Sequence, residues 1–359
     1  MLKIMKLNAC LVLLTICQII HTVNSKFATC TSNESCIPFP MCDAVNKIRD
    51  KQRLSAEDDK YLKSIHCKTE NRLAYACCAN KVKVNFESKL PKSPKCGIQF
   101  SNRIIGGEIA NIDEYPWTVQ IQHINENNST ESFCGGTLIN ESYVLTAAHC
   151  TKLKPFQVRL GDWDIGTNPD CDEDGRCNDP YVEIPIENIT VHENYNFSIE
   201  IQCNDIALIK LQRNVTLSDF IKPICLPIDE HVQNMNLTDH YVEVAGFGCT
   251  NVENQTMSVR KKWVGLRISP QSYCKKVYAR RNVVINSKQI CAGGEEGRDS
   301  CNGDSGGALM KQITKQRKIP YYSLVGLVSF GPNKCGTKDY PAVYTRISEF
   351  MDWIFNNMD

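Results

Sequence analysis

Cysteine is the residue type that most restricts what this chain can fold into. The 359 residues contain 20 cysteines, and two of them, Cys10 and Cys17, lie in an apolar leader that we expect to be removed. Taking these two from 20 leaves 18, an even number and far too many for a reducing compartment. We therefore expect a secreted, extracellular protein whose fold depends on disulfide bonds.

The leader is predicted over residues 1–25. Lys3 and Lys6 precede an apolar run at residues 7–20, and the segment ends at Val23-Asn-Ser25, a small-x-small cleavage pattern. The apolar run is shorter than the roughly 20 residues that a membrane-spanning helix needs, so a signal peptide is favoured over an anchor. No later segment is apolar for long enough, and we expect no membrane partner.

The net charge of the chain argues against nucleic acid as a partner. Removing the leader takes two lysines from the 41 Lys and Arg and leaves 39 against 40 Asp and Glu. A chain so close to neutral is not expected to bind nucleic acid. Nine Asn-x-Ser/Thr sequons agree with a secretory route, at Asn33, Asn127, Asn128, Asn140, Asn188, Asn196, Asn214, Asn236 and Asn254.

The chain begins, after the leader, with a small cysteine-rich module over residues 30–78. A core of this size needs covalent staples, and spacing alone does not select among the pairings that six cysteines allow. Ser55-Ala-Glu-Asp58 predicts a capping box that opens a short helix toward Ile65. The six cysteines are Cys30, Cys36, Cys42, Cys67, Cys77 and Cys78.

A linker is predicted over residues 79–103. It has two prolines, Pro91 and Pro94, and a single acidic residue, Glu87. A basic run of this kind could bind an anionic surface, but a solvated linker is the favoured interpretation. Its basic residues are Lys81, Lys83, Lys89, Lys92, Lys95 and Arg103.

The remainder of the chain is predicted to be mostly β-structure. Short β-rich runs are separated by turn signals, which is typical of a barrel or a sandwich. From Ser348 onward, Phe350, Met351 and Ile354 have helical spacing and predict one C-terminal helix. The clearest β-rich runs are residues 117–123, 156–160, 241–245 and 322–330.

Three short segments together predict a nucleophilic serine. Residues 299–306 read Asp-Ser-Cys-Asn-Gly-Asp-Ser-Gly, residues 146–150 read Thr-Ala-Ala-His-Cys, and residues 204–208 read Asn-Asp-Ile-Ala-Leu. A serine hydroxyl is a poor nucleophile at neutral pH, so it needs a histidine base, and the base needs a buried carboxylate to hold its tautomer. We assign these roles to Ser305, His149 and Asp205.

These segments, in the order His149, Asp205, Ser305, resemble chymotrypsin-like serine proteases, and the resemblance covers residues 104–359. It implies an all-β fold of two six-stranded β-barrels with the active site between them, followed by a C-terminal helix. It also implies that Gly303 and Ser305 supply the backbone N–H groups of an oxyanion hole.

The same resemblance implies trypsin-like specificity. Asp299 would form the floor of the primary pocket, where only a cationic side chain can pair a buried carboxylate, so we expect cleavage after Arg or Lys. Ser329 and Gly331 would form one wall and leave room for a long side chain. On the other wall, Ala342 stands where a glycine is usual, and its methyl group should narrow the pocket.

Residues 102–107, Asn-Arg-Ile-Ile-Gly-Gly, resemble the activation site of this family. Cleavage after Arg103 would free the α-amino group of Ile104, which would fold inward and pair with Asp304. A buried ammonium and a buried carboxylate are costly unless they meet, so we expect an inactive zymogen before cleavage. Arg103 also implies that the upstream activator is itself a trypsin-like protease.

The adjacent cysteines 77 and 78, placed ahead of a protease, resemble the CLIP domain of arthropod clotting and immune proteases. An unrelated knotted module is the alternative. The resemblance implies that residues 30–78 form a small disulfide-rich CLIP domain with the bonds Cys30–Cys77, Cys36–Cys67 and Cys42–Cys78.

In the protease part, resemblance implies five further bonds, one of which would keep the N-terminal piece attached after activation. Parity favours a bond between Cys203 and Cys249, with free or intermolecular thiols as the open alternative. The five bonds are Cys96–Cys225, the tether, and Cys134–Cys150, Cys171–Cys177, Cys274–Cys291 and Cys301–Cys335.

One acidic loop is a candidate calcium site. Residues 162–193 contain ten acidic residues and one basic residue, Arg176. Relatives bind calcium here through an acid placed like Asp162 together with backbone carbonyls, and calcium takes six to eight oxygens. A solvated acidic loop is the alternative, and the predicted chemistry requires no cofactor.

We therefore expect a secreted endopeptidase that activates another protein zymogen in an arthropod proteolytic cascade and is controlled by a serpin-type inhibitor. A catalytically weak homologue that acts by binding is the competing hypothesis, and the intact His149, Asp205 and Ser305 argue against it. A digestive trypsin would leave the CLIP module without a purpose. The natural substrate depends on loops beyond the three catalytic residues.

Overall fold

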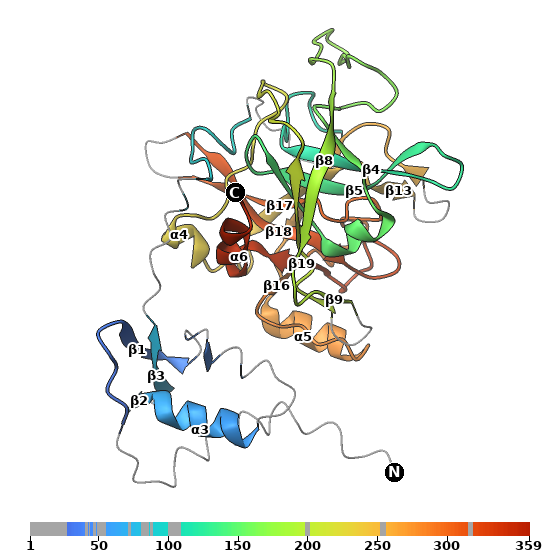
Figure 1. Ribbon diagram of the computed structural model, residues 1–359. Coiled ribbons are helices and arrows are strands. Elements are labelled where there is room, and N and C mark those ends of the chain that lie inside the picture. Colours follow the sequence, from blue (N-terminus) through green and yellow to red (C-terminus); the bar gives the residue numbers. More distant parts are fainter. Residues whose placement is uncertain are drawn as a thin grey trace. The chain divides into compact units, whose positions relative to one another are not determined.

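A computed structural model of the chain forms two compact units, residues 1–84 and residues 85–359 (Figure 1). The predicted leader and the predicted activation site at Arg103 and Ile104 lie outside the described residues. The structure describes residues 27–39, 42, 44–45, 48, 55–70, 73–79, 86, 89–99, 109–197, 202–251, 256–314 and 319–359.

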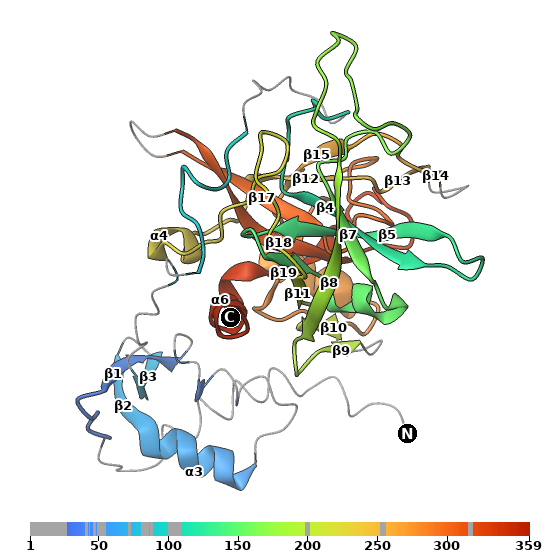
Figure 2. The ribbon, with the colours of Figure 1, turned by 45° about the horizontal axis from the view of Figure 1, so that its top comes forward.

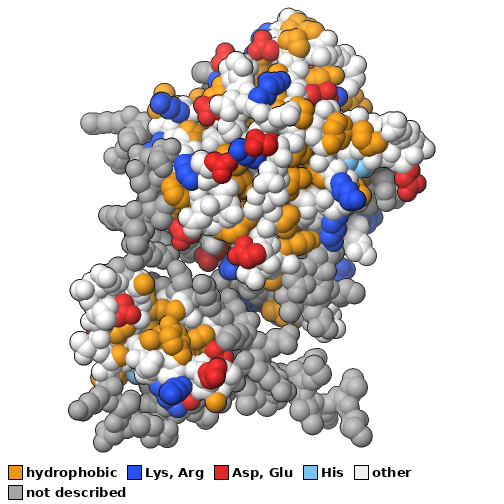
Figure 3. Space-filling view, in the orientation of Figure 1, with side chains coloured by type: hydrophobic (Ala, Val, Ile, Leu, Met, Phe, Trp, Pro, Cys, Tyr) orange, Lys and Arg blue, Asp and Glu red, His pale blue; other side chains and the backbone are white. Residues whose placement is uncertain are grey.

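The N-terminal unit is a three-stranded antiparallel sheet with one helix. The strands β1 (Glu34–Pro38), β2 (His66–Glu70) and β3 (Leu73–Ala79) are ordered β1-β3-β2. The register places Cys36 opposite Cys77 across β1 and β3. Hydrophobic side chains of this unit are visible on one face of it in Figure 3, and Val45, Leu62 and Ala76 belong to its small core.

Helix α3 (Ala56–Ile65) begins as the sequence predicts. The Asp58 backbone N–H donates to Ser55 Oγ at 3.1 Å, and the Ser55 backbone N–H donates to Asp58 Oδ2 at 2.9 Å. This reciprocal pair is a capping box, which satisfies two N–H groups that the first helical turn leaves without partners. The predicted helix start is therefore confirmed.

The C-terminal unit contains a closed barrel, ordered β11-β6-β5-β4-β7-β8 (Figure 2). Side chains fill its interior, as they must in a barrel this narrow: Val119, Ile121, Leu145, Val158 and Ile184 are fully buried. The strands are β4 (Thr118–Ile124), β5 (Thr130–Leu138), β6 (Tyr143–Thr146), β7 (Gln157–Leu160), β8 (Val182–Val191) and β11 (Ala207–Leu211).

The second six-stranded sheet of this unit has the order β15-β12-β17-β18-β19-β16. Its outer strands meet only through an isolated bridge between Ile268 and Ala292. The predicted all-β fold is confirmed, with one barrel fully closed and the other joined at that single bridge. The strands are β12 (Tyr241–Gly246), β15 (Lys262–Arg267), β16 (Gln289–Ala292), β17 (Ala308–Ile313), β18 (Tyr321–Phe330) and β19 (Ala342–Arg346).

Short elements connect and close the two sheets. The predicted C-terminal helix is confirmed as a short helix, α6 (Met351–Asn356), which follows the 3₁₀ turn η4 (Ile347–Glu349). Among the described residues, no helix is both long and apolar enough to cross a bilayer. The other short elements are η3 (Ala148–Leu153), β9 (Asn196–Phe197), β10 (Gln202–Cys203), α4 (Glu230–Gln233), β13 (Cys249–Asn251), β14 (Thr256–Met257) and α5 (Gln271–Ala279).

Part of the predicted linker packs into the C-terminal unit. Leu90 is 3% exposed and belongs to the main hydrophobic core. The ring of Phe86 lies edge-on to that of Phe355 in α6, with 5.4 Å between centroids. Lys89 Nζ lies 4.8 Å from the centroid of the Phe355 ring and donates to carbonyl groups at the end of α6. Phe86, Lys89 and Leu90 are therefore packed against the protein and are not part of the solvated linker that we expected.

The next part of this segment is held by backbone contacts. Cys96 is bonded to Cys225, the Gly97 N–H donates to Pro223 O at 2.8 Å, and the Tyr322 N–H donates to Gly97 O at 2.8 Å. Gly97 has a φ of 69°, and any Cβ there would collide with the Tyr322 backbone, so only glycine suits this close approach. Residues 96–97 therefore form part of the C-terminal unit.

Candidate active site

A histidine and an aspartate form the centre of the site. His149 lies on η3, just after β6, and Asp205 lies two residues before β11; β6 and β11 are paired strands of the closed barrel. His149 Nδ1 lies 2.8 Å from Asp205 Oδ2, and the His149 backbone N–H donates to Asp205 Oδ1 at 3.0 Å. The His149 side chain is 20% exposed and that of Asp205 only 3%. This geometry holds the imidazole with Nε2 available for proton transfer.

The second sheet also holds Asp205. Ser329 Oγ on β18 donates to Asp205 Oδ2 at 2.6 Å, and Thr345 Oγ1 on β19 donates to the Asp205 carbonyl at 2.8 Å. Sequence reasoning placed Ser329 only in the specificity pocket and did not predict a role for Thr345. Both contacts span more than a hundred residues of chain, and no local sequence signal announces them.

Ser305 lies in the turn before β17, against the segment that carries His149. The Gly135 N–H on β5 donates to Ser305 O at 2.8 Å, and Ser305 O lies 3.5 Å from Cys150 Sγ. Its neighbour Gly306 has a φ of 79°, and a Cβ there would collide with Thr146. The structure thus brings together the three segments that the sequence singled out.

The loop before Ser305 presents two backbone N–H groups, those of Gly303 and Ser305. Gly303 has a φ of 93°, a region that favours glycine. Within the described residues, neither N–H donates a hydrogen bond. Free amides at a sharp turn can stabilise an oxyanion. Sequence reasoning missed Met257 on β14, whose side chain would collide with any Cβ at Gly303.

Asp304 points inward from the same loop. Its Oδ1 accepts from the Gly248 N–H at 2.9 Å and its Oδ2 from the Cys301 N–H at 3.0 Å. The absence of side chains at Gly246 and Gly248 makes room for this carboxylate. Burial raises the pKa of Asp304 to about 6, and no ion pair to it occurs among the described residues. It is a buried carboxylate suited to receive a cation.

Asp299 is a second buried carboxylate near the catalytic residues. Its Oδ2 accepts from the Gly336 N–H at 3.0 Å, while its buried Oδ1 has no hydrogen-bond partner in the described part of the chain. Burial raises the pKa of Asp299 to about 6, and the hydrogen bond from Gly336 partly opposes that shift. A buried acceptor without a partner costs stability until a ligand satisfies it.

Gly331 and Ala342 are the residues that we predicted on the two walls beside Asp299. Ala342 is 3% exposed, and a Cβ at Gly331 would lie 3.4 Å from the Ala342 methyl group. The two residues therefore face each other at van der Waals distance. Tyr344 OH lies 2.9 Å from Ser300 Oγ behind this wall. That the Ala342 methyl narrows the space leading to Asp299 stays a prediction.

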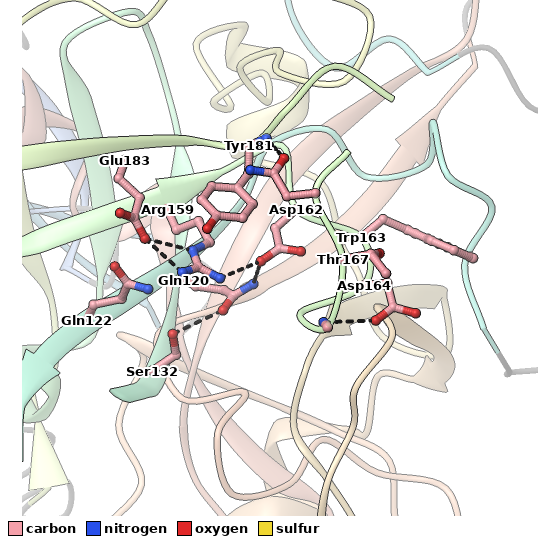
Figure 4. Close-up of polar contacts among 12 residues, drawn as sticks. Gln120, Gln122, Ser132, Arg159, Asp162, Trp163, Asp164, Thr167, Tyr181 and Glu183 are labelled. Carbon is pink, nitrogen blue, oxygen red and sulfur yellow. Dashed lines mark hydrogen bonds and ion pairs between the residues drawn. The ribbon is translucent and has the colours of Figure 1, made fainter. Parts of the chain in front are cut away.

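Asp162, the candidate calcium ligand, already has protein partners. Its Oδ2 accepts from Gln120 Nε2 at 2.9 Å and from Arg159 Nη1 at 3.1 Å (Figure 4). Arg159 also donates to Glu183 Oε1 at 2.8 Å and stacks on the ring of Tyr181. In the described residues, no set of three or more ligating side chains gathers around Asp162. The Asp162 carboxylate is thus already paired with an arginine, which disfavours a cation here. Calcium binding at Asp162 stays a prediction.

A buried lysine lies in the same region. Lys261 is 3% exposed, its backbone N–H donates to Trp163 O at 2.8 Å, and its carbonyl accepts from the Ala110 N–H at 2.9 Å. Burial lowers the pKa of Lys261 to about 8, and Asp162 is the first of the nearby carboxylates that oppose this shift. Lysine thus supplies a second positive charge close to Asp162.

The structure forms eight disulfide bonds among the described residues, and they are the pairs that the two resemblances imply. Cys203 lies on β10 and Cys249 on β13, and these two cysteines are not bonded to each other. Parity was therefore a misleading guide for this pair. The bonds are Cys30–Cys77, Cys36–Cys67, Cys42–Cys78, Cys96–Cys225, Cys134–Cys150, Cys171–Cys177, Cys274–Cys291 and Cys301–Cys335.

Comparison with known proteins agrees with this geometry. The family model described as Trypsin matches residues 104–354. The chain therefore belongs to the trypsin family of serine proteases. A second model, described as the regulatory CLIP domain of proteinases, matches residues 30–78, which makes the chain a serine protease of the CLIP-domain kind.

Two similar proteins and one solved structure extend over nearly the whole chain. CLIP domain-containing serine protease B4 of Anopheles gambiae is 38% identical, over 90% of this chain and 89% of its own length. Phenoloxidase-activating factor 3 of Holotrichia diomphalia is 37% identical, over 97% of this chain and 98% of its own. The crystal structure of the Drosophila Grass CLIP serine protease of the Toll pathway superposes with a TM-score of 0.67 at 29% identity, covering 93% of this chain and 98% of that one.

Proposed function

We propose that this protein is a secreted endopeptidase, made as a zymogen, that cuts other proteins after Arg or Lys in an extracellular cascade. The observation that carries the specificity is Asp299, whose buried Oδ1 has no hydrogen-bond partner among the described residues. The hydrogen-bonded pair of His149 and Asp205, beside the turn that holds Ser305, supports the chemistry.

In the first half of the reaction, Ser305 Oγ attacks the scissile carbonyl carbon and His149 Nε2 takes the hydroxyl proton. Asp205 stabilises the imidazolium through Nδ1, and the N–H groups of Gly303 and Ser305 donate hydrogen bonds to the carbonyl oxygen as negative charge develops on it. His149 then returns the proton to the leaving amine. Water repeats these steps on the acyl-enzyme and releases the second product.

Specificity follows from the electrostatics of Asp299. An arginine or lysine side chain brings a cation to the unpartnered carboxylate, and this pairing removes a desolvation cost that the empty pocket carries. A phenylalanine side chain would leave the carboxylate buried and unpaired. Discrimination against such a substrate should be large, because a site built for a polar partner rejects ligands without one.

Activation is proposed to follow cleavage after Arg103. The buried Asp304 carboxylate, whose pKa burial raises to about 6, would receive the new ammonium of Ile104 and hold the loop that carries Gly303. Arg103 makes the upstream activator a trypsin-like protease. The bond between Cys96 and Cys225 would keep the N-terminal piece attached.

Secretion and a place in a cascade complete the proposal. Eight disulfide bonds suit an oxidising compartment. Phenoloxidase-activating factor 3 is named for the activation of another protein, and Grass for the Toll pathway. By analogy, the substrate would be a protein zymogen, and a serpin-type inhibitor would stop the enzyme.

The direct test uses peptide amides that differ only in the residue before the scissile bond. After cleavage at Arg103, we expect Arg and Lys peptides to be hydrolysed on the order of 10²-fold faster than the Phe peptide. The matched control is Ser305→Ala, taken through the same activation, which corrects for residual activator. Equal rates for the wild type and Ser305→Ala would favour a binding-only homologue, and fast hydrolysis after Phe would refute the assignment of the pocket.

A further inference from the structure

Helix α5 and its C-terminal end carry an unusual charge pattern. Between Glu253 and Glu295 the sequence contains nine Lys and Arg residues and no acidic residue. Four of the nine, Lys275, Lys276, Arg280 and Arg281, fall within seven consecutive positions. Elsewhere the charges are mixed: the face of the C-terminal unit in Figure 3 shows acidic and basic side chains interspersed.

Three of these cations share the solvent face of the helix. Cys274, Val277 and Tyr278 are buried and define the opposite face, and the bond between Cys274 and Cys291 fixes the helix to β16. With 3.6 residues per turn, Lys275, Lys276 and Arg280 therefore point outward. All three are exposed.

Within the residues that the structure describes, these three side chains have no counter-charge. No ion pair or hydrogen bond from Lys275, Lys276 or Arg280 to another side chain occurs in the described part of the chain. Three like charges held within two helical turns repel one another. A protein usually relieves such repulsion with interspersed acids, and α5 has none.

The helix is anchored to the specificity pocket. Tyr278 OH donates to Pro341 O at 2.8 Å, and Tyr273 OH donates to Asp339 O at 2.9 Å. The guanidinium of Arg281 lies 4.6 Å from the centroid of the Tyr340 ring. Residues 339–341 lead directly into Ala342, so a ligand on α5 would bind beside one wall of the pocket without entering it.

We propose that the outer face of α5 binds a sulfated polysaccharide, through Lys275, Lys276 and Arg280. Ser272 and Ala279 lie between these cations, and the exposed Tyr273 beside Arg280 has its hydroxyl bonded to Asp339 O. One aromatic ring of this kind is much less than the clustered anchors that dominate protein interfaces. A ligand that binds this surface would therefore do so mainly by charge. The regularly repeated sulfates of a linear polysaccharide meet that requirement, and such binding weakens as salt rises.

The test compares the full-length zymogen with the variant Lys275→Ala/Lys276→Ala/Arg280→Ala on immobilised heparin. We expect the variant to elute at lower salt and its affinity for heparin to fall about tenfold, as the loss of three exposed ion pairs implies. The matched control is Lys95→Ala/Lys154→Ala/Arg213→Ala, which removes the same charge from exposed positions elsewhere.

The elution of the two variants from heparin decides whether α5 is the binding site. The proposal is supported if only the α5 variant loses affinity and if its thermal unfolding is unchanged. Equal losses in both variants would show that net charge, and not α5, attracts heparin, and the proposal would be wrong. It would also be wrong if polyglutamate displaced heparin from the wild type at equal charge concentration, because that result would indicate an acidic protein segment as the partner.

Discussion

Asp299 and Asp304 are five residues apart, and both are buried carboxylates whose pKa burial raises to about 6. Their surroundings give them different tasks. Asp304 accepts two backbone hydrogen bonds, from Gly248 and Cys301, whereas one oxygen of Asp299 has no partner in the described chain. Asp304 can therefore hold an internal ammonium, and Asp299 can hold the cation of a substrate.

The raised pKa of Asp299 predicts a pH dependence of ligand binding. A benzamidinium ion pairs with the carboxylate form, so its affinity for the activated enzyme should rise as pH increases through about 6 and level off above it. Each pH unit below that value should weaken binding up to about tenfold. Calorimetric titration from pH 4.5 to 8 measures this.

His149 belongs to the same active site, and the control removes its imidazole. The variant His149→Ala should keep the pH dependence of benzamidine binding if Asp299 is its cause. A flat profile in this variant would contradict the assignment.

Ala342 predicts an altered preference between the two basic residues. A Cβ atom placed on Gly331 would lie at van der Waals distance from the Ala342 methyl group. We expect this methyl group to narrow the path to Asp299. Ala342→Gly should widen that path and raise kcat/KM for Arg peptides relative to Lys peptides, because the guanidinium is the wider group. The ratio of the two kcat/KM values is the measurement. An unchanged ratio would show that other residues set the width of the pocket. The control is Ala76→Gly, the same change in the core of the N-terminal unit.

At the scale of elements, the segment before the activation site is the most informative. Leu90 is buried in the main core, Asn140 Nδ2 donates to the Lys89 carbonyl at 3.0 Å, and Phe86 packs on α6. Residues that precede the cut therefore support a helix at the far end of the chain. After the proposed cleavage at Arg103, this packing would hold the N-terminal piece together with the bond between Cys96 and Cys225.

This packing predicts a stability effect outside the family-matched region. Leu90→Ala should lower the free energy of unfolding of the zymogen by about 2–5 kcal/mol, as expected for a buried leucine truncated to alanine. Urea unfolding followed by tryptophan fluorescence measures the change. Lys95→Ala, an exposed position in the same segment, should change it by less than about 0.5 kcal/mol. Equal small effects in both variants would show that the segment does not contribute to the core.

At the scale of the molecule, activation is expected to change the loop around Ser305 without separating the chain. The segment from β14 to β15 contacts both the loop before Ser305 and the chain downstream of Arg103. Met257 packs against Gly303, and the Ser258 N–H donates to Gly248 O at 3.1 Å. The backbone of Lys261 is hydrogen-bonded to Ala110 and Trp163. The chain just downstream of the cut is thus linked by backbone contacts to the loop that holds Asp304.

Asp304→Asn tests this coupling. After cleavage at Arg103, the variant should keep its fold, but kcat/KM should fall by about a hundredfold or more, because a buried ammonium would lose its counter-charge. The cleaved wild type should run as one band on a non-reducing gel and as two bands after reduction. Full activity in Asp304→Asn would refute the proposed pairing with Ile104, and two bands without reductant would refute the tether.

The sequence by itself predicted those features whose physical cause is local. The capping box at Ser55 and Asp58 involves neighbours three residues apart. The all-β fold and the CLIP module followed from short motifs that resemble known families, and the comparisons confirm both. The segments around His149, Asp205 and Ser305 were recognised because each needs a specific backbone turn next to a specific side chain.

Only the tertiary structure decided the features that depend on distant partners. Ser329 reaches Asp205 across 124 residues, and Asp162 meets Gln120 across 42, which gave the candidate calcium ligand a protein partner. Leu90 looked like part of a polar linker because most of its neighbours are polar, yet it is buried by residues of the barrel. Burial and pairing of this kind arise from contacts that the folded chain creates, and no short window of sequence contains them.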